Sequence, residues 1–66
     1  MKATMNQWTA KQQGGVTHFE RGNLCVTWQH DRHRYDVFRN GERVEFGTTP
    51  HYPLPQFLEY VSMAWN

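Results

Sequence analysis

The dipeptide Asn40-Gly41 constrains the fold of this chain more than any other feature of its sequence. A type I′ turn needs positive φ at both central residues, and asparagine and glycine tolerate that conformation best. The residues on either side, 35–39 and 42–46, are rich in β-branched and aromatic side chains. The sequence therefore predicts a β-hairpin over residues 35–46.

A two-residue turn also fixes which residues of the hairpin face one another. The predicted pairs, from the turn outward, are Arg39–Glu42, Phe38–Arg43, Val37–Val44, Asp36–Glu45 and Tyr35–Phe46. Side chains alternate between the two faces of a strand. Tyr35, Val37, Val44 and Phe46 are therefore predicted to share one apolar face, which leaves Phe38 on the other.

Two further loops extend the pattern: Gly22-Asn23 and Asp31-Arg32 can each serve as a two-residue hairpin loop. With all three loops in place, nearly every large apolar residue lies on the same face of a sheet. The predicted strands cover roughly residues 16–20, 23–30, 33–39 and 43–47. We therefore expect an α+β fold, in which an antiparallel meander of three to four strands is covered on one face by a C-terminal helix.

The helix is predicted after a proline-rich connector. Pro50, Pro53 and Pro55 stiffen this segment, and Pro55 suits the first position of a helix. The helix is expected from about residue 55 to residue 65. Its predicted core-facing residues are Phe57, Leu58, Val61, Ala64 and Trp65. Tyr60 and Met63 fall outside this stripe.

Residues 1–14 leave three alternatives open. Met1, Met5 and Trp8 recur at helical spacing, so a short helix is possible, and Gly14-Gly15 would end it. An added edge strand and a loose segment are the other two readings. In each case we expect Trp8 to dock on the domain.

Size and charge limit the classes of function. The 66 residues predict a single small domain over 1–66, and the net charge of +1 argues against extensive phosphate neutralisation. Cys25 is the lone cysteine, which excludes an internal disulfide and suits a reducing compartment. The N-terminus lacks a signal peptide, and no apolar run reaches membrane-spanning length. We expect a cytoplasmic protein from a short, complete bacterial or phage reading frame.

Protein–protein binding is the function that the sequence favours. Phe38 is large, apolar and predicted to lie on the solvent face, while Tyr60 and Met63 add an apolar strip on the helix. Aromatic residues, methionine and arginine are enriched at interfaces. The predicted contact residues are Phe38, Arg43, Tyr60 and Met63. The expected role is that of a small regulator or inhibitor that occludes a surface of a larger protein, and self-association stays open.

Nucleic-acid binding is the alternative, because arginines gather near the hairpin turns. The candidate residues are Arg32, Arg34, Arg39 and Arg43. An antiparallel sheet followed by a C-terminal helix is similar to the layout of AP2-type and integrase arm-binding domains. The predicted solvent face, however, carries more acidic than basic residues, since Glu45 joins Glu20 and Asp36 on it. A sheet that binds phosphates should be clearly basic.

Catalytic and metal-binding readings are more distant. His30, His33 and His51 could approach one another at one end of the sheet and hold a metal ion, although their spacing is not a zinc signature. With an N-terminal helix, the element order would resemble double-stranded-RNA-binding or HicA-like toxin domains, in which a strand histidine can be catalytic. His18 is that candidate. No nucleophile triad or phosphate-binding loop is present in the sequence, so we expect neither an enzyme nor a cofactor.

Overall fold

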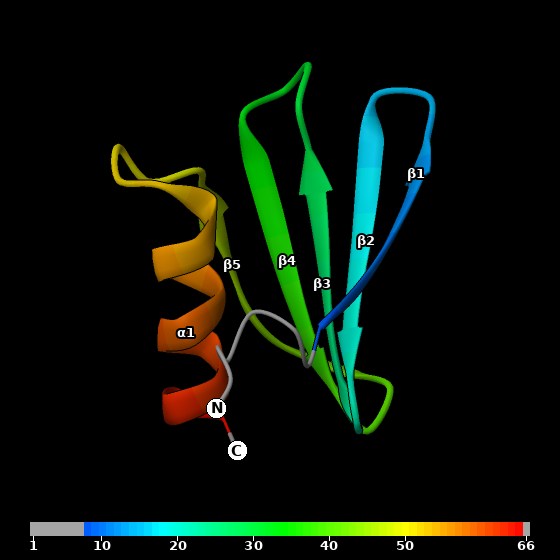
Figure 1. The fold of residues 1–66 in the computed structure, drawn as a ribbon, viewed down its shortest axis with the longest axis vertical. Helices are drawn as coiled ribbons and strands as arrows, with labels where there is room; N and C mark the ends of the chain where they lie inside the picture. Colours follow the sequence, from blue (N-terminus) through cyan, green and yellow to red (C-terminus); the bar gives the residue numbers. More distant parts are fainter. Residues whose placement is uncertain (1–7, 66) are drawn as a thin grey trace.

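The computed structural model describes residues 8–65, which form one antiparallel sheet and one helix (Figure 1). The elements are β1 (Thr9–Gln13), β2 (Val16–Arg21), β3 (Leu24–Gln29), β4 (Arg34–Arg39), β5 (Glu42–Thr48) and α1 (Leu54–Ala64). The strands lie in the sheet in their chain order, so β1 and β5 are its edges. The α+β meander with a C-terminal helix is confirmed, but the sheet has five strands instead of three or four.

The additional strand is β1. It pairs with β2 through the Gly14-Gly15 turn, in which Gly14 has a φ of 60°. All residues of β1 are exposed, and all are polar except the small Ala10. Of the three alternatives for the N-terminal segment, residues 9–13 take the edge strand. Met1 and Met5 lie outside the described residues, while Trp8 is buried in the core, as expected.

Two of the three predicted two-residue turns form, and the third is a longer turn over residues 30–33, in which His33 has a φ of 52°. Asn40 and Gly41 have φ values of 55° and 81°, as a type I′ turn requires, and Gly22 has a φ of 59°. The Asp31-Arg32 loop aligns Gln29 with Arg34, which is the predicted register. The alignment of β2, β3 and β4 is therefore confirmed, with Phe19, Val26 and Val37 in one row of the sheet.

The register of β5 is wrong beyond its second pair. Arg43 lies opposite Phe38 as predicted, but Glu45, not Val44, lies opposite Val37. Val44 is the extra residue of a β-bulge, which reverses the faces of the residues after it. Asp36 consequently faces Phe46, and the predicted Asp36–Glu45 pair does not form.

The helix begins one residue earlier than predicted and ends at Ala64. Pro55 sits in the first turn, where the missing N–H has no intrahelical partner to lose. Phe57, Leu58 and Val61 are buried against the sheet, as predicted. Ala64, in contrast, is exposed, while Trp65 is half-buried and packs against the core as predicted.

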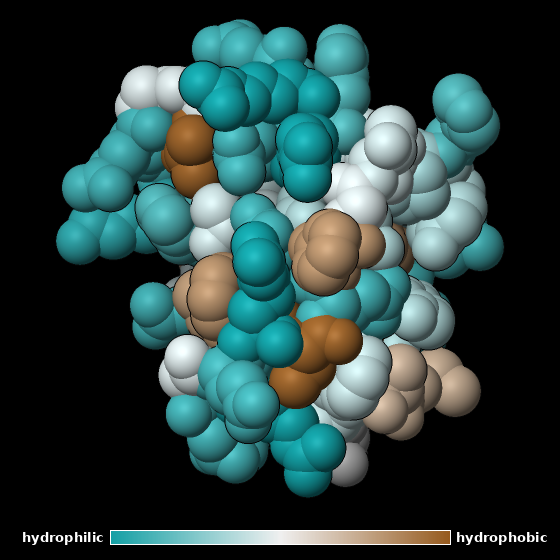
Figure 2. Space-filling model, turned by 180° about the vertical axis from the view of Figure 1, so that it is seen from behind, coloured by the Kyte–Doolittle hydropathy of each residue, from teal (hydrophilic) through white to brown (hydrophobic). Residues whose placement is uncertain are grey.

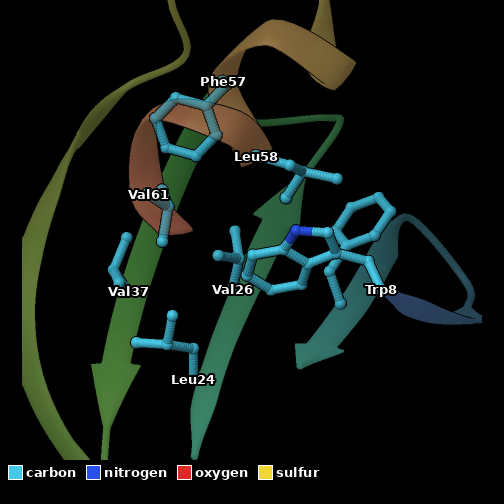
Figure 3. Close-up of a cluster of buried hydrophobic side chains, with 8 residues drawn as sticks. Trp8, Leu24, Val26, Val37, Phe57, Leu58 and Val61 are labelled. Atoms are coloured by element: carbon cyan, nitrogen blue, oxygen red, sulfur yellow. The ribbon is translucent and has the colours of Figure 1, made fainter. Parts of the chain in front are cut away.

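The core lies between α1 and one face of the sheet (Figure 3). Its buried members are Trp8, Phe19, Leu24, Val26, Val37, Phe57, Leu58 and Val61. Phe57 also meets two half-buried rings of the sheet, with its centroid 5.2 Å from Trp28 and 4.6 Å from Tyr35, both edge-to-face. Helix docking therefore depends on a few large side chains, since α1 is the only helix in residues 8–65.

Replacement of Leu58 by alanine is expected to destabilise the fold by about 2–5 kcal/mol, because the side chain is fully buried between α1 and the sheet. Urea unfolding followed by circular dichroism would measure this change. Met63→Ala on the same helix is the matched control, since Met63 is 78% exposed and its truncation should change stability by about 0.5 kcal/mol or less. Equal losses in both variants would contradict the described orientation of α1.

Candidate interaction surface

The face of the sheet away from α1, called here the open face, carries three rows of side chains. The rows are Thr9–Glu20–Cys25–Phe38–Arg43, Lys11–His18–Thr27–Asp36–Phe46 and Gln13–Val16–Gln29–Arg34–Thr48. Figure 2 views the molecule from the side opposite to that of Figure 1 and shows separate hydrophobic spots within a mostly hydrophilic surface. The open face is therefore mixed in character, not an apolar sheet surface.

Phe46 is the most exposed aromatic side chain of the described residues, at 59% of its full accessibility. The guanidinium carbon of Arg43 lies 4.8 Å from the centre of the Phe46 ring, within cation–π range. Arg43 Nη1 also donates to Asp36 Oδ1 at 3.3 Å, and Asp36 Oδ2 accepts from Gln29 Nε2 at 3.3 Å. These contacts place the Phe46 ring beside a positive group on the open face.

Phe38 lies in the row next to Phe46, between Cys25 and Arg43. It is half-buried, whereas Val37 on the other side of β4 is fully buried, so the predicted facing of this strand is confirmed. Burial and the neighbouring charge of Glu20 raise the pKa of the Cys25 thiol. The thiol therefore stays protonated at neutral pH and contributes to this surface as a small apolar group.

The charge of the open face differs from the prediction. Glu45 points to the helix side, and β1 adds Lys11. The open face carries Lys11, Arg34 and Arg43 against Glu20 and Asp36. The expectation of a net acidic surface is therefore wrong, because it rested on the unbulged register and on a sheet without β1.

Glu45 accepts hydrogen bonds from three aromatic side chains on the helix side of the sheet, and we call this group the Glu45 clamp. Tyr35 Oη donates to Oε2 at 2.7 Å, while Tyr60 Oη and Trp65 Nε1 each donate to Oε1 at 2.8 Å. Tyr60 belongs to α1 and Trp65 follows it directly. The clamp thus ties both the helix and its C-terminal end to strand β5.

The clamp shifts the pKa values of its members. Burial alone would raise the pKa of Glu45, but the hydrogen bonds from Tyr35, Trp65 and Tyr60 outweigh it, so the pKa lies below its ordinary value. Burial and the hydrogen bond to Glu45 raise the pKa of Tyr35, and the same hydrogen bond, followed by burial, raises the pKa of Tyr60. The clamp therefore combines an ionised carboxylate with neutral phenols at ordinary pH.

These contacts give the physical reason for the bulge in β5. Without the bulge, Glu45 would leave its three donors and lie opposite Asp36, a like-charge pair that destabilises a sheet. The bulge also places Gly47 opposite Tyr35, and a Cβ added at Gly47 would lie 3.4 Å from the Tyr35 ring. The tyrosine ring covers the glycine backbone at this point, where a bulkier residue would compete for the space.

The residues predicted for protein binding fall into two groups. Phe38 and Arg43 are neighbours on the open face. Tyr60 and Met63 are exposed on α1, and Tyr60 is also a member of the Glu45 clamp. The structure therefore brings the first pair together with Phe46 and leaves the second pair on another surface.

The predicted nucleic-acid residues are also divided. Arg34 and Arg43 lie on the open face, in different rows. Arg39 flanks the Asn40-Gly41 turn, while Arg32 lies in the loop at the opposite end of β4. Of the four predicted arginines, only Arg34 and Arg43 can contact the same ligand on the open face.

The histidines do not gather. Across residues 8–65, no three His, Cys, Asp or Glu side chains are placed to hold a metal ion, so His30, His33 and His51 do not form a common site. His30 Nε2 lies 2.8 Å from Thr17 Oγ1. His18 lies on the open face, 3.5 Å from Thr27 Oγ1, but it is preceded by strand β1 and not by the helix on which the toxin-like reading depended. The described part of the chain contains no pocket beside any of them.

Sequence reasoning missed Phe46 and Glu45, which occupy faces opposite to those predicted. One signal was visible: the unbulged register forced Asp36 against Glu45. The three donors that resolve this conflict lie 10, 15 and 20 residues from Glu45 and could not be placed from the sequence pattern.

Comparisons with known proteins add no family. No protein-family model, no curated protein and no solved structure matches the chain. Within the described residues, α1 is too short to span a membrane. The open face and the Glu45 clamp are thus the features on which a functional proposal can rest.

The Glu45 clamp predicts a pH-dependent stability. Because the folded pKa of Glu45 lies below its ordinary value of 4.5, its contribution is complete above about pH 4.5 and is lost as the pH falls through the lowered value. Near pH 7, Glu45→Gln should reduce the free energy of unfolding by about 1–2 kcal/mol, allowing for partial solvent exposure. Thermal unfolding of both proteins between about pH 3 and pH 7 would test this.

The control for this measurement is Glu42→Gln, because Glu42 is an exposed residue beside the hairpin turn. The difference between wild type and Glu45→Gln should shrink in acid, while Glu42→Gln should follow the wild type. A difference for Glu45→Gln that stays constant down to the lowest pH would show that the carboxylate charge is not what stabilises the clamp.

Proposed function

We propose that this chain is a small non-enzymatic binding protein that docks on a larger protein through its open face and occludes a surface there. The contact is centred on Phe46, Arg43 and Phe38, called here the Phe46 patch. A regulator or inhibitor can act in this way, since occlusion requires a stable surface and no chemistry.

The observation that carries the proposal is the outward position of Phe46. The same bulge that turns Glu45 inward leaves a phenylalanine exposed at the end of an otherwise polar row, on the edge strand β5. An exposed aromatic ring beside an arginine has the composition of an interface anchor. Phe38 extends the apolar area toward Cys25, while Arg43 and Arg34 supply charge around it.

Tyr60 and Met63 take a secondary place in this proposal. They lie on α1, which covers the other face of the sheet beside β5 (Figure 1). A partner that wraps the β5 edge would reach both the Phe46 patch and Met63. Tyr60 already donates its hydroxyl to Glu45, so its first role is internal.

Site-specific photo-crosslinking in the native host tests the protein partner. A benzophenone amino acid at position 46 should give one dominant adduct, because the ring lies at the centre of the proposed contact. The same probe at Gln56, which is exposed on α1, is the matched control. Adduct formation at Gln56 alone would contradict docking on the open face.

With the captured partner purified, Phe46→Ala should weaken binding by about tenfold or more, since a central aromatic anchor is worth over 1 kcal/mol. Phe46 is exposed, so the stability of the free protein should change little. Isothermal titration calorimetry would measure the affinity, with Met63→Ala as the comparison. If Met63→Ala weakens binding more than Phe46→Ala, the centre of the contact lies on α1 and not on the open face.

Nucleic-acid binding is a second candidate because the open face is not acidic. Lys11, Arg34 and Arg43 could contact phosphates, and the exposed ring of Phe46 could stack on a base. Arg32 and Arg39, at opposite ends of β4, could extend the contact beyond the sheet. A single strand suits this surface better than a duplex, since stacking requires unpaired bases.

Fluorescence anisotropy with a labelled oligothymidine of about 15 nucleotides tests the second candidate. Affinity should fall steeply between about 50 and 200 mM salt, and Arg34→Ala or Arg43→Ala should each reduce the salt slope by about one. Arg21→Ala is the control, because Arg21 pairs with Leu24 outside the rows of the open face. Absence of binding at the lowest salt concentration would eliminate this candidate.

A further inference from the structure

Strand β5 has two registers that its sequence can satisfy. In the bulged register of the structure, Glu45 faces α1 and Phe46 lies on the open face. In the unbulged register, set by the Asn40-Gly41 turn alone, Glu45 faces the solvent and Phe46 faces the helix. The two arrangements share the turn and the Arg39–Glu42 and Phe38–Arg43 pairs, so they differ only beyond Arg43.

We propose that β5 is a register switch that controls the Phe46 patch, with the Glu45 clamp holding the exposed state. This inference rests on the proposed function, because it concerns the regulation of the same patch. When the clamp holds, Phe46 is available to a partner. When the clamp releases, a one-residue shift turns Phe46 inward and removes it from the open face.

Each of the two registers gains some contacts and loses others. The bulged register provides three hydrogen bonds to Glu45 and fits Gly47 under the Tyr35 ring, but it leaves Phe46 in water. The unbulged register places Phe46 opposite Tyr35, where Gly47 now lies, so the Tyr35 ring must move aside to let Phe46 face the helix. This register gains the Val37–Val44 pair. It loses the clamp and brings Asp36 against Glu45. A change in a few polar contacts can therefore decide between them.

Neither the turn nor the helix prevents the shift. Val44 faces the core in the bulged register, where it packs beside the buried cluster, and it would also face the core in the unbulged one. The shift returns one residue to the connector between β5 and α1, so the connector becomes longer and not shorter. The backbone hydrogen bonds between β4 and β5 beyond Arg43 must all be exchanged, together with the 2.8 Å bond from the Thr49 N–H to the His33 carbonyl.

The switch links the helix to the open face. Tyr60 and Trp65 supply two of the three donors, so a partner that displaces the C-terminal part of α1 would release Glu45 and withdraw Phe46. A partner that binds Phe46 would, by the same linkage, hold α1 in place. Binding on one face of the sheet is thereby coupled to helix docking on the other.

The decisive variant is Glu45→Lys. In the unbulged register the lysine lies opposite Asp36 as an attractive pair. In the bulged register the lysine would lie beside the three former donors to Glu45 and would offer them no acceptor. Cross-strand nuclear Overhauser effects in labelled protein would report the register. The contacts between Asp36 and Phe46 should be lost and replaced by contacts between Tyr35 and Phe46.

Glu42→Lys is the matched control, since it makes the same charge change at a position whose pairing with Arg39 is common to both registers. It should keep the Asp36–Phe46 contacts of the wild type. If Glu45→Lys folds and also keeps them, the proposal is overturned.

Should Glu45→Lys fail to fold, the milder double variant Tyr60→Phe/Trp65→Phe tests the register switch. It removes two donors and keeps Glu45, so a second set of signals confined to β5 and its β4 partners should appear. A single set with the wild-type contacts would overturn the proposal.

The register readout needs no partner, so it separates this proposal from the proposed function. A register change in Glu45→Lys without any partner for Phe46 would leave the switch standing and remove the proposed function. Partner binding that is equally strong in Glu45→Lys and wild type would leave the proposed function standing and remove the register switch.

Discussion

The carboxylate of Glu45 is the group on which the arrangement of this small domain most depends. It accepts from one tyrosine of the sheet, one tyrosine of the helix and the tryptophan that follows the helix. Hydrogen bonds to an ionised group are stronger than neutral ones. This carboxylate therefore does more than stabilise: it sets the register of β5, joins α1 to the sheet edge and determines which aromatic side chain meets the solvent.

The core explains why a polar contact has this influence. Helix α1 contributes only Phe57, Leu58 and Val61 as fully buried side chains, and Trp8 fills the space beside them (Figure 3). A domain of 66 residues buries little apolar surface for each residue that it orders. Individual polar contacts then become a large share of what fixes the helix position, and the strand that supplies the acceptor must adapt to them.

Much of the fold could be predicted from local sequence signals. The Gly22-Asn23 turn and the loop at Asp31-Arg32 predicted the alignment of β2, β3 and β4, and the proline-rich connector predicted the start of the helix to within one residue. The Asn40-Gly41 turn predicted only the first two pairs between β4 and β5. The prediction failed where a distant group decides a local choice. The bulge at Val44 depends on donors from β4, from α1 and from the residue that follows α1. The pairing of β1 with β2 depends on backbone hydrogen bonds that the polar side chains of residues 9–13 do not indicate. Both errors affect the open face. The predicted face lacked Phe46 and Lys11 and included Glu45, so its predicted net charge was wrong.

The position of the bulge also bears on how the sheet ends. Strands at sheet edges offer free backbone groups to other chains, and natural proteins block them with bulges and with charged side chains that point inward. The β5 edge has both, in Val44 and Glu45. Strand β1 follows a regular ladder with β2, and Lys11 is the one charged residue among Thr9–Gln13. Unwanted strand addition, and with it the first step of aggregation, should therefore begin at β1 and spare β5.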